Sequence, residues 1–128
     1  MSGAGADYAR MALACIRLVN GTAALVAPAG FARRLGIDPA AQPGSLYAFR
    51  LFGIRTIVIG AELLSSDQAT RGRALRTGVL VHSVDATAAL IAGATGRLPA
   101  RAATTAVLVS TTNAFLAAVA SSAAGEDS

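Results

Sequence analysis

The sequence has no lysine and no tryptophan, and it has one cysteine and one histidine. A single cysteine excludes an internal disulfide. A zinc ion needs at least three converging His, Cys or carboxylate ligands, and only His82, Asp85 and Glu62 could supply them inside the apolar part of the chain. No nucleotide-binding loop or zinc motif is present either. We therefore predict no metal and no cofactor.

Aromatic residues are also scarce, at 5% of the chain, and this decides how the basic charge is interpreted. The formal net charge is +4, and all 11 basic residues are arginines. A surface that binds nucleic acid needs a solvated basic stripe, with aromatic rings where single strands stack. Several of these arginines instead lie within apolar runs, so we predict no nucleic-acid partner.

Charged residues make up 14% of the sequence, against about a quarter in an ordinary soluble domain. Hydrophobic residues make up 54%, and they gather in four long blocks. A helix of about 20 apolar residues crosses the roughly 30 Å hydrocarbon layer of a membrane. The blocks have that length, and they cover about residues 8–27, 46–65, 75–94 and 102–120.

Short connectors join the blocks and force successive helices to run in opposite directions. We therefore predict an all-α fold, a single domain over residues 1–128 built as a four-helix up-down-up-down transmembrane bundle. The protein is then a multi-pass protein of the cell membrane, with the lipid bilayer as its partner. In this fold we expect Cys15 to be buried, and we expect the small, polar tail after residue 120 to be disordered.

Polar and charged residues lie near the middle of each block. A charge at the centre of a bilayer costs at least ~2.5–3.5 kcal/mol, so these side chains are predicted to face the interior of the bundle. Residues three apart share one face of a helix. Three pairs have this spacing: Arg17 with Asn20, His82 with Asp85, and Ser110 with Asn113.

Ion pairing between these blocks can also be anticipated. Either Arg17 or Arg55 is expected to pair with Asp85. Arg55 and Glu62 are seven residues apart and share a face, whereas Arg50 is rotated away from Arg55. If all of these side chains face inward, three arginines oppose two carboxylates. The positive charge in excess favours a bound anion or water over a closed network of ion pairs.

Two kinds of function fit this pattern. In the first, the cluster binds or transforms a small lipophilic molecule, as a cofactor-independent isomerase, cyclase or hydrolase does. His82 and Asp85 are then the catalytic acid–base pair. In the second, the protein is a non-enzymatic membrane subunit or a homo-oligomer, and the cluster only locks the helices. The substrate-binding residues of the first function are Arg17, Asn20, Arg50, Arg55, Glu62 and Asn113.

The segment Arg50-Leu-Phe-Gly53-Ile-Arg55, followed by Gly60, resembles a segment of small four-span bacterial membrane proteins that are common in actinobacteria. Their layout is similar to that of the DoxX-like family. An arginine in the first block and a His-x-x-Asp in the third extend the likeness over most of the chain. Such proteins often have Asp where this chain has Thr56, which removes one ion-pair partner. The resemblance implies a fold and a location, but no activity.

Overall fold

The computed structural model of the protein describes residues 3–126, and within them it contains helices and no strand. The prediction of an all-α fold is confirmed. The four predicted blocks correspond to the four long helices, and a short helix follows the first of them. The helices are α1 (Gly3–Val26), α2 (Pro28–Arg34), α3 (Gly44–Leu63), α4 (Gln68–Ala94) and α5 (Ala100–Glu126).

Prolines and one aspartate set several helix boundaries. Pro28 lies in the first turn of α2, where its missing N–H has no helical partner to lose. Asp67 caps α4 by accepting a hydrogen bond from the backbone N–H of Thr70, so the helix begins before the predicted block at residue 75. α5 continues to Glu126, and the predicted disorder is therefore wrong for residues 121–126. Residues 127–128 of the tail lie outside the described residues.

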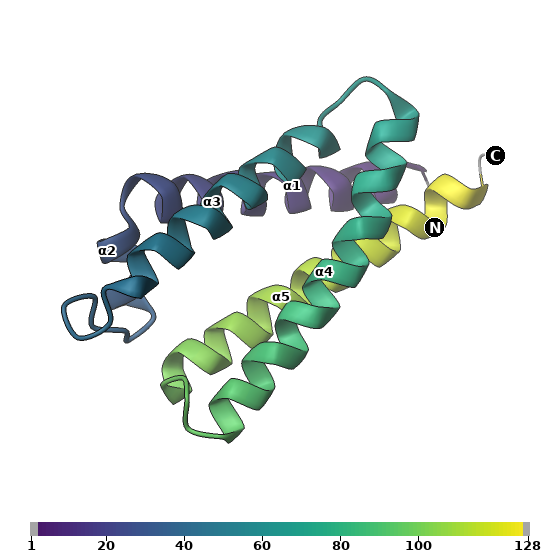
Figure 1. The fold of residues 1–128 in the computed structure, drawn as a ribbon. Helices are drawn as coiled ribbons and strands as arrows, with labels where there is room; N and C mark the ends of the chain where they lie inside the picture. Colours follow the sequence, from purple (N-terminus) through teal and green to yellow (C-terminus); the bar gives the residue numbers. More distant parts are fainter. Residues whose placement is uncertain (1–2, 127–128) are drawn as a thin grey trace.

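The four long helices form two antiparallel pairs, α1 with α3 and α4 with α5 (Figure 1). α1 also lies against α5, whereas α3 and α4 have little contact. The two pairs therefore diverge from the end at which α1 begins and α5 ends (Figure 1). At the other end the chain after α2 returns to α5, and Ile37 packs there with Ala32 and Ala102. The structure thus has two helix pairs joined at both ends, and the predicted four-helix up-down-up-down bundle is not confirmed.

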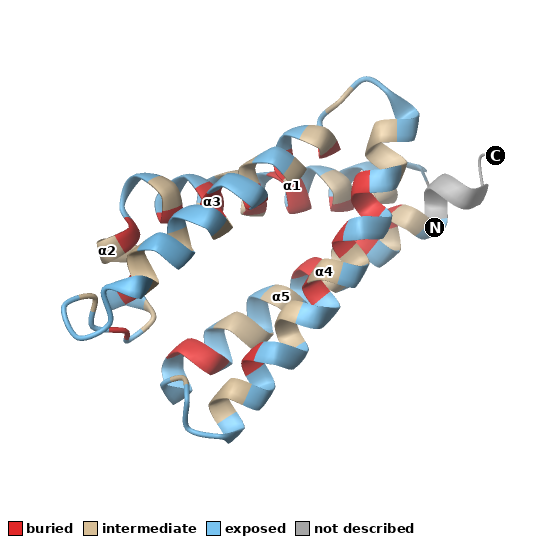
Figure 2. Ribbon diagram, in the orientation of Figure 1, coloured by how far each residue is buried: buried red, intermediate tan, exposed pale blue. Residues whose placement is uncertain are grey.

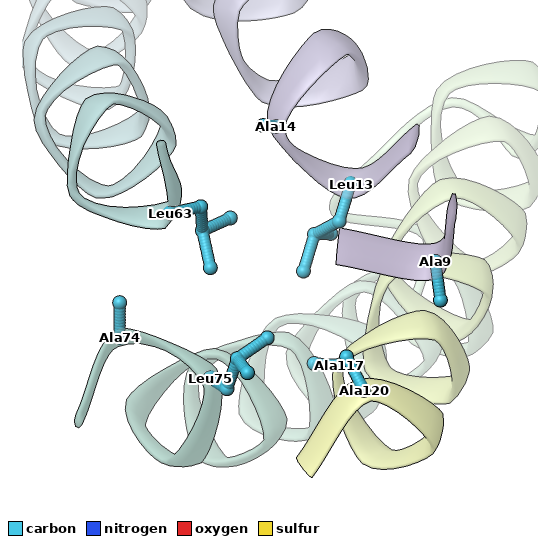
Figure 3. Packing of buried hydrophobic residues seen from close by; sticks show 8 residues of the cluster. All are labelled: Ala9, Leu13, Ala14, Leu63, Ala74, Leu75, Ala117 and Ala120. Carbon is cyan, nitrogen blue, oxygen red and sulfur yellow. The ribbon is translucent and has the colours of Figure 1, made fainter. Parts of the chain in front are cut away.

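An apolar cluster joins the two pairs near the end at which α1 begins. Leu13 and Leu63 are its largest fully buried side chains. Figure 3 shows both side chains pointing into the space between the four helices, toward Leu75 of α4. Small side chains let helices approach closely, and alanines form the rest of the cluster. They are Ala9, Ala14, Ala74, Ala117 and Ala120.

Glycine brings α1 and α3 into close contact. A Cβ atom added to Gly53 would lie 2.6 Å from the carbonyl oxygen of Gly21 and 2.8 Å from the backbone nitrogen of Leu25. No side chain fits between two backbones at this distance. The contact holds the middle of α3 against α1, and polar side chains of both helices lie beside it.

Large apolar side chains are mostly exposed, and few of them are in the core. Figure 2 shows exposed residues along the four long helices. Cys15 is exposed as well, so its predicted burial is wrong. A monomer in water rarely exposes so much apolar surface, because the exposed area is unfavourable. The exposed residues occur on all four long helices and include Val19, Val26, Leu51, Ile54, Leu80, Leu90, Leu108 and Phe115.

In the part of the chain that the structure describes, three helices are long and apolar enough to cross a membrane: α1, α4, and α5 over Ala100–Ser122. The sequence predicted four spans. α3 is not among the three, and three charged residues lie within it: Arg50, Arg55 and Glu62. The three apolar helices are compatible with a multi-pass membrane protein.

Candidate functional site

A polar cavity lies between the four long helices, at mid-length. Its volume is about 40 Å³. A single buried water molecule needs roughly 10–15 Å³ on this measure, so the cavity has room for about three waters or for one small charged group. The ten residues that line it are Arg17, Asn20, Phe52, Arg55, Thr56, His82, Asp85, Val109, Ser110 and Asn113.

The cavity lies between two apolar contacts. The lining residues lie next to the apolar cluster along the helices. Leu13 of α1 is one turn from Arg17, and Ala117 of α5 is one turn from Asn113. Beyond the cavity, Ala102 of α5 packs against the chain that follows α2. Apolar packing therefore holds the polar side chains from both ends.

Arg17 is the most deeply buried charged residue of the cavity, with 2% of its surface exposed. Its Nη2 donates a hydrogen bond to Nε2 of His82. Its Nε is buried and has no hydrogen-bond partner. Among the described residues no carboxylate forms an ion pair with Arg17, since the two ion pairs found there belong to Arg10 and Arg55. A buried guanidinium therefore faces the cavity with no counter-charge in contact.

The same bond fixes the state of His82, which is 5% exposed. A guanidinium can only donate, so the Nε2 atom that meets Arg17 must accept. His82 is consequently neutral, with its proton on Nδ1. A neutral imidazole contributes no charge to offset Arg17.

Arg55 and Asp85 form the second polar contact across the cavity. Nη2 of Arg55 lies 3.6 Å from Oδ2 of Asp85, and the side chains are 52% and 35% exposed. The pair links α3 to α4, two helices that otherwise have little contact with each other. With Asp85 paired to Arg55 and His82 neutral, the cavity keeps one positive charge in excess, at Arg17.

Asn113 of α5 supplies an unpartnered acceptor. The residue is 5% exposed, and its Oδ1 is buried without a hydrogen-bond partner. An unmade hydrogen bond of a buried group costs about 1–3 kcal/mol, and more for a charged group. Arg17 Nε and Asn113 Oδ1 are thus a buried donor and a buried acceptor, on residues that line the cavity, with no hydrogen-bond partner among the described residues.

The structure brings together all three pairs whose spacing placed them on one helix face. Asp85 forms an ion pair with Arg55, one of its two expected partners, and His82 is hydrogen-bonded to Arg17. Arg50 and Glu62 do not line the cavity: Arg50 is exposed near the start of α3, and Glu62 is half-buried near its end.

Phe52 and Val109 also line the cavity, and they were not predicted from the sequence because only polar and charged residues were considered there. Helical spacing could have found them, because Phe52 lies three residues before Arg55 and Val109 lies four before Asn113. Within residues 3–126, no three His, Cys, Asp or Glu side chains lie close enough to hold a metal ion. Comparison with family models, curated proteins and solved structures finds no match for this chain.

Proposed function

We propose that the protein is a multi-pass protein of the cell membrane and that its polar cavity binds the anionic head of a small lipophilic molecule. The three spanning-length apolar helices and the outward-facing apolar side chains support the location. We propose α3 as the fourth span of a single four-helix domain, because Leu51, Ile54 and Val58 are exposed along it. The resemblance to four-span bacterial membrane proteins agrees with this topology and stays a proposal.

The single observation that supports binding of an anionic ligand is the uncompensated charge of Arg17. A buried ion is stable only when a counter-charge and hydrogen bonds replace its lost hydration. Arg17 lines the cavity, has one neutral partner, His82, and has a buried Nε with no hydrogen-bond partner. An anion in the cavity beside the guanidinium supplies the missing charge and accepts hydrogen bonds from it.

The cavity volume favours binding of a head group over enclosure of a whole molecule. About 40 Å³ admits a carboxylate and excludes a hydrocarbon body. The geometry also favours binding over acid–base chemistry, because His82 accepts from Arg17 while Asp85 pairs with Arg55. A catalytic role for His82 with Asp85 stays a prediction.

Melting of the purified protein in maltoside micelles tests the proposal. Sodium decanoate is compared with 1-decanol, which has the same chain and no charge. A ligand that binds the folded state raises the melting temperature. We expect decanoate to raise it more than decanol does, and we expect Arg17→Gln to remove the difference. Equal shifts by the two compounds, or none, would overturn the proposal.

A second candidate is that the cluster serves only to lock the helices of a membrane subunit or homo-oligomer. The observation behind it is that two polar contacts, Arg17–His82 and Arg55–Asp85, tie α4 to the α1–α3 pair. Asp85→Ala and Arg55→Ala discriminate between the two functions. If both variants abolish folding in detergent, the locking role is supported. If both remain folded and monodisperse and still respond to decanoate, the binding role is supported.

A further inference from the structure

An apolar groove lies beside the polar cavity, between α1 and α5. Its volume is about 260 Å³. Two of its lining residues, Val109 and Asn113, also line the polar cavity, so the two spaces adjoin at these side chains. One of the two neighbouring spaces is lined by charged residues, and the other is lined mainly by apolar residues. The full lining of the groove is Ile16, Leu108, Val109, Thr112 and Asn113.

The groove opens on the outer surface of the molecule. Leu108 is 63% exposed and Val109 is 37% exposed, whereas Asn113 at the inner end is 5% exposed. In a membrane this outer surface faces the acyl chains of the lipid. A molecule can therefore enter from the bilayer with its tail in the groove and its head toward Arg17, without passing through water.

Charge and size limit the class of ligand. One positive charge is in excess in the cavity, which matches the single charge of a carboxylate better than the double charge of a phosphate monoester. The cavity admits a small head, and the groove that adjoins it suits one hydrocarbon chain. A two-chain phospholipid has a larger head than a carboxylate and a second tail that this groove does not take.

We propose that the ligand is a single-chain carboxylate amphiphile whose head lies between Arg17 and Asn113 and whose tail occupies the α1–α5 groove; this rests on the proposed function. The guanidinium of Arg17 donates to the carboxylate, and Oδ1 of Asn113 accepts from a water that hydrates the head. The tail packs along Leu108 and Thr112. Ligand specificity then has two separable parts, one for the charge and one for the chain.

Direct binding of tritiated decanoate to the micellar protein tests the two parts separately. Thr112→Trp fills the groove at a residue that does not line the polar cavity. Leu90→Trp is the matched control, because Leu90 is 62% exposed and lines a different apolar hollow, between α4 and α5. Arg17→Gln tests the head. Asn113→Leu is a second head variant of similar volume that keeps the buried arginine and its bond to His82.

We expect Thr112→Trp to weaken decanoate binding by about tenfold or more, which corresponds to about 1.4 kcal/mol. Leu90→Trp should bind as the unaltered protein does. If Thr112→Trp and Leu90→Trp bind equally while Arg17→Gln or Asn113→Leu loses binding, the groove proposal is overturned and the anion site stands. If no head variant changes binding, the proposed function fails as well.

Discussion

Arg17 of α1 donates a hydrogen bond to Nε2 of His82 on α4, between residues that lie 65 positions apart in the chain. Both residues are at least nine-tenths buried. The bond links one helix of each antiparallel pair. It therefore stabilises the joint between the two helix pairs, and it also orients the guanidinium toward the cavity.

Replacement of His82 by leucine should destabilise the protein strongly. The variant keeps the side-chain volume but leaves a buried guanidinium with no protein partner, so we expect the free energy of unfolding to fall by about 2–4 kcal/mol. His82→Gln places an amide near the position of Nε2 and should lose about 1 kcal/mol. Denaturant titration in mixed micelles, followed by circular dichroism, measures both values.

Ser83→Ala is the control for these variants, because Ser83 is exposed on the same helix and its hydroxyl donates to the carbonyl of Val79, within that helix. Its unfolding should be almost unchanged. Equal stability of His82→Leu and His82→Gln would show that the Arg17–His82 bond contributes nothing beyond packing.

The helices themselves could be predicted from the sequence, because each apolar block is long and the blocks are separated by proline, glycine and polar residues. The i,i+3 spacing also predicted which polar residues share a face, and Asn20, His82 and Asn113 do line one cavity. The choice of partners could not be predicted. Whether Arg17 or Arg55 meets Asp85 depends on the rotation and axial shift of each helix, and packing between helices sets both of these.

The divergence of the helix pairs could not be predicted either. Hydropathy gives the length of a span but not the distance between spans, which depends on local contacts such as that of Gly21 with Gly53. Cys15 was misplaced for a related reason. A small residue inside an apolar block can face either a neighbouring helix or the outside, and its type does not say which.

Close packing at Gly53 leads to a second prediction. Gly53→Ala puts a methyl group 2.6 Å from the carbonyl oxygen of Gly21, so α1 and α3 must move apart. We expect a loss of about 1–3 kcal/mol in unfolding free energy and weaker decanoate binding, because Arg55 and Thr56 lie on the displaced segment. Gly30→Ala is the control, since a Cβ there meets nothing within 4 Å. A Gly53→Ala protein as stable as Gly30→Ala would contradict the close contact.

The single cysteine allows a test of the membrane location. Cys15 is exposed near the middle of α1, so in a bilayer it faces lipid rather than water. We expect it to resist a charged maleimide in intact membranes and to react once SDS disperses them. An Ala40→Cys residue in a Cys15→Ser background should react before SDS is added, because Ala40 is exposed in the loop before α3. Rapid labelling of Cys15 in intact membranes would contradict a spanning α1.

The cap of α4 should make stability depend on acid pH. The hydroxyl of Thr70 donates to Oδ2 of Asp67 at 2.5 Å and its backbone N–H donates at 3.0 Å. These bonds, the hydroxyl first, hold the pKa of Asp67 below its ordinary value of 3.8. A carboxyl with a lowered pKa in the folded state stabilises the fold above its unfolded pKa. That contribution is lost as the pH falls through the folded pKa, below 3.8.

Asn at position 67 can still accept from Thr70 but cannot titrate, so Asp67→Asn isolates this effect from the other carboxyls. We expect the melting temperature of the unaltered protein to exceed that of Asp67→Asn near neutral pH, and the difference to shrink as the pH falls below 3.8. Asp67→Ala, which has no cap at any pH, should melt lower than both across the range. A difference between the unaltered protein and Asp67→Asn that stays constant with pH would show that the charge of Asp67 does not contribute to the cap.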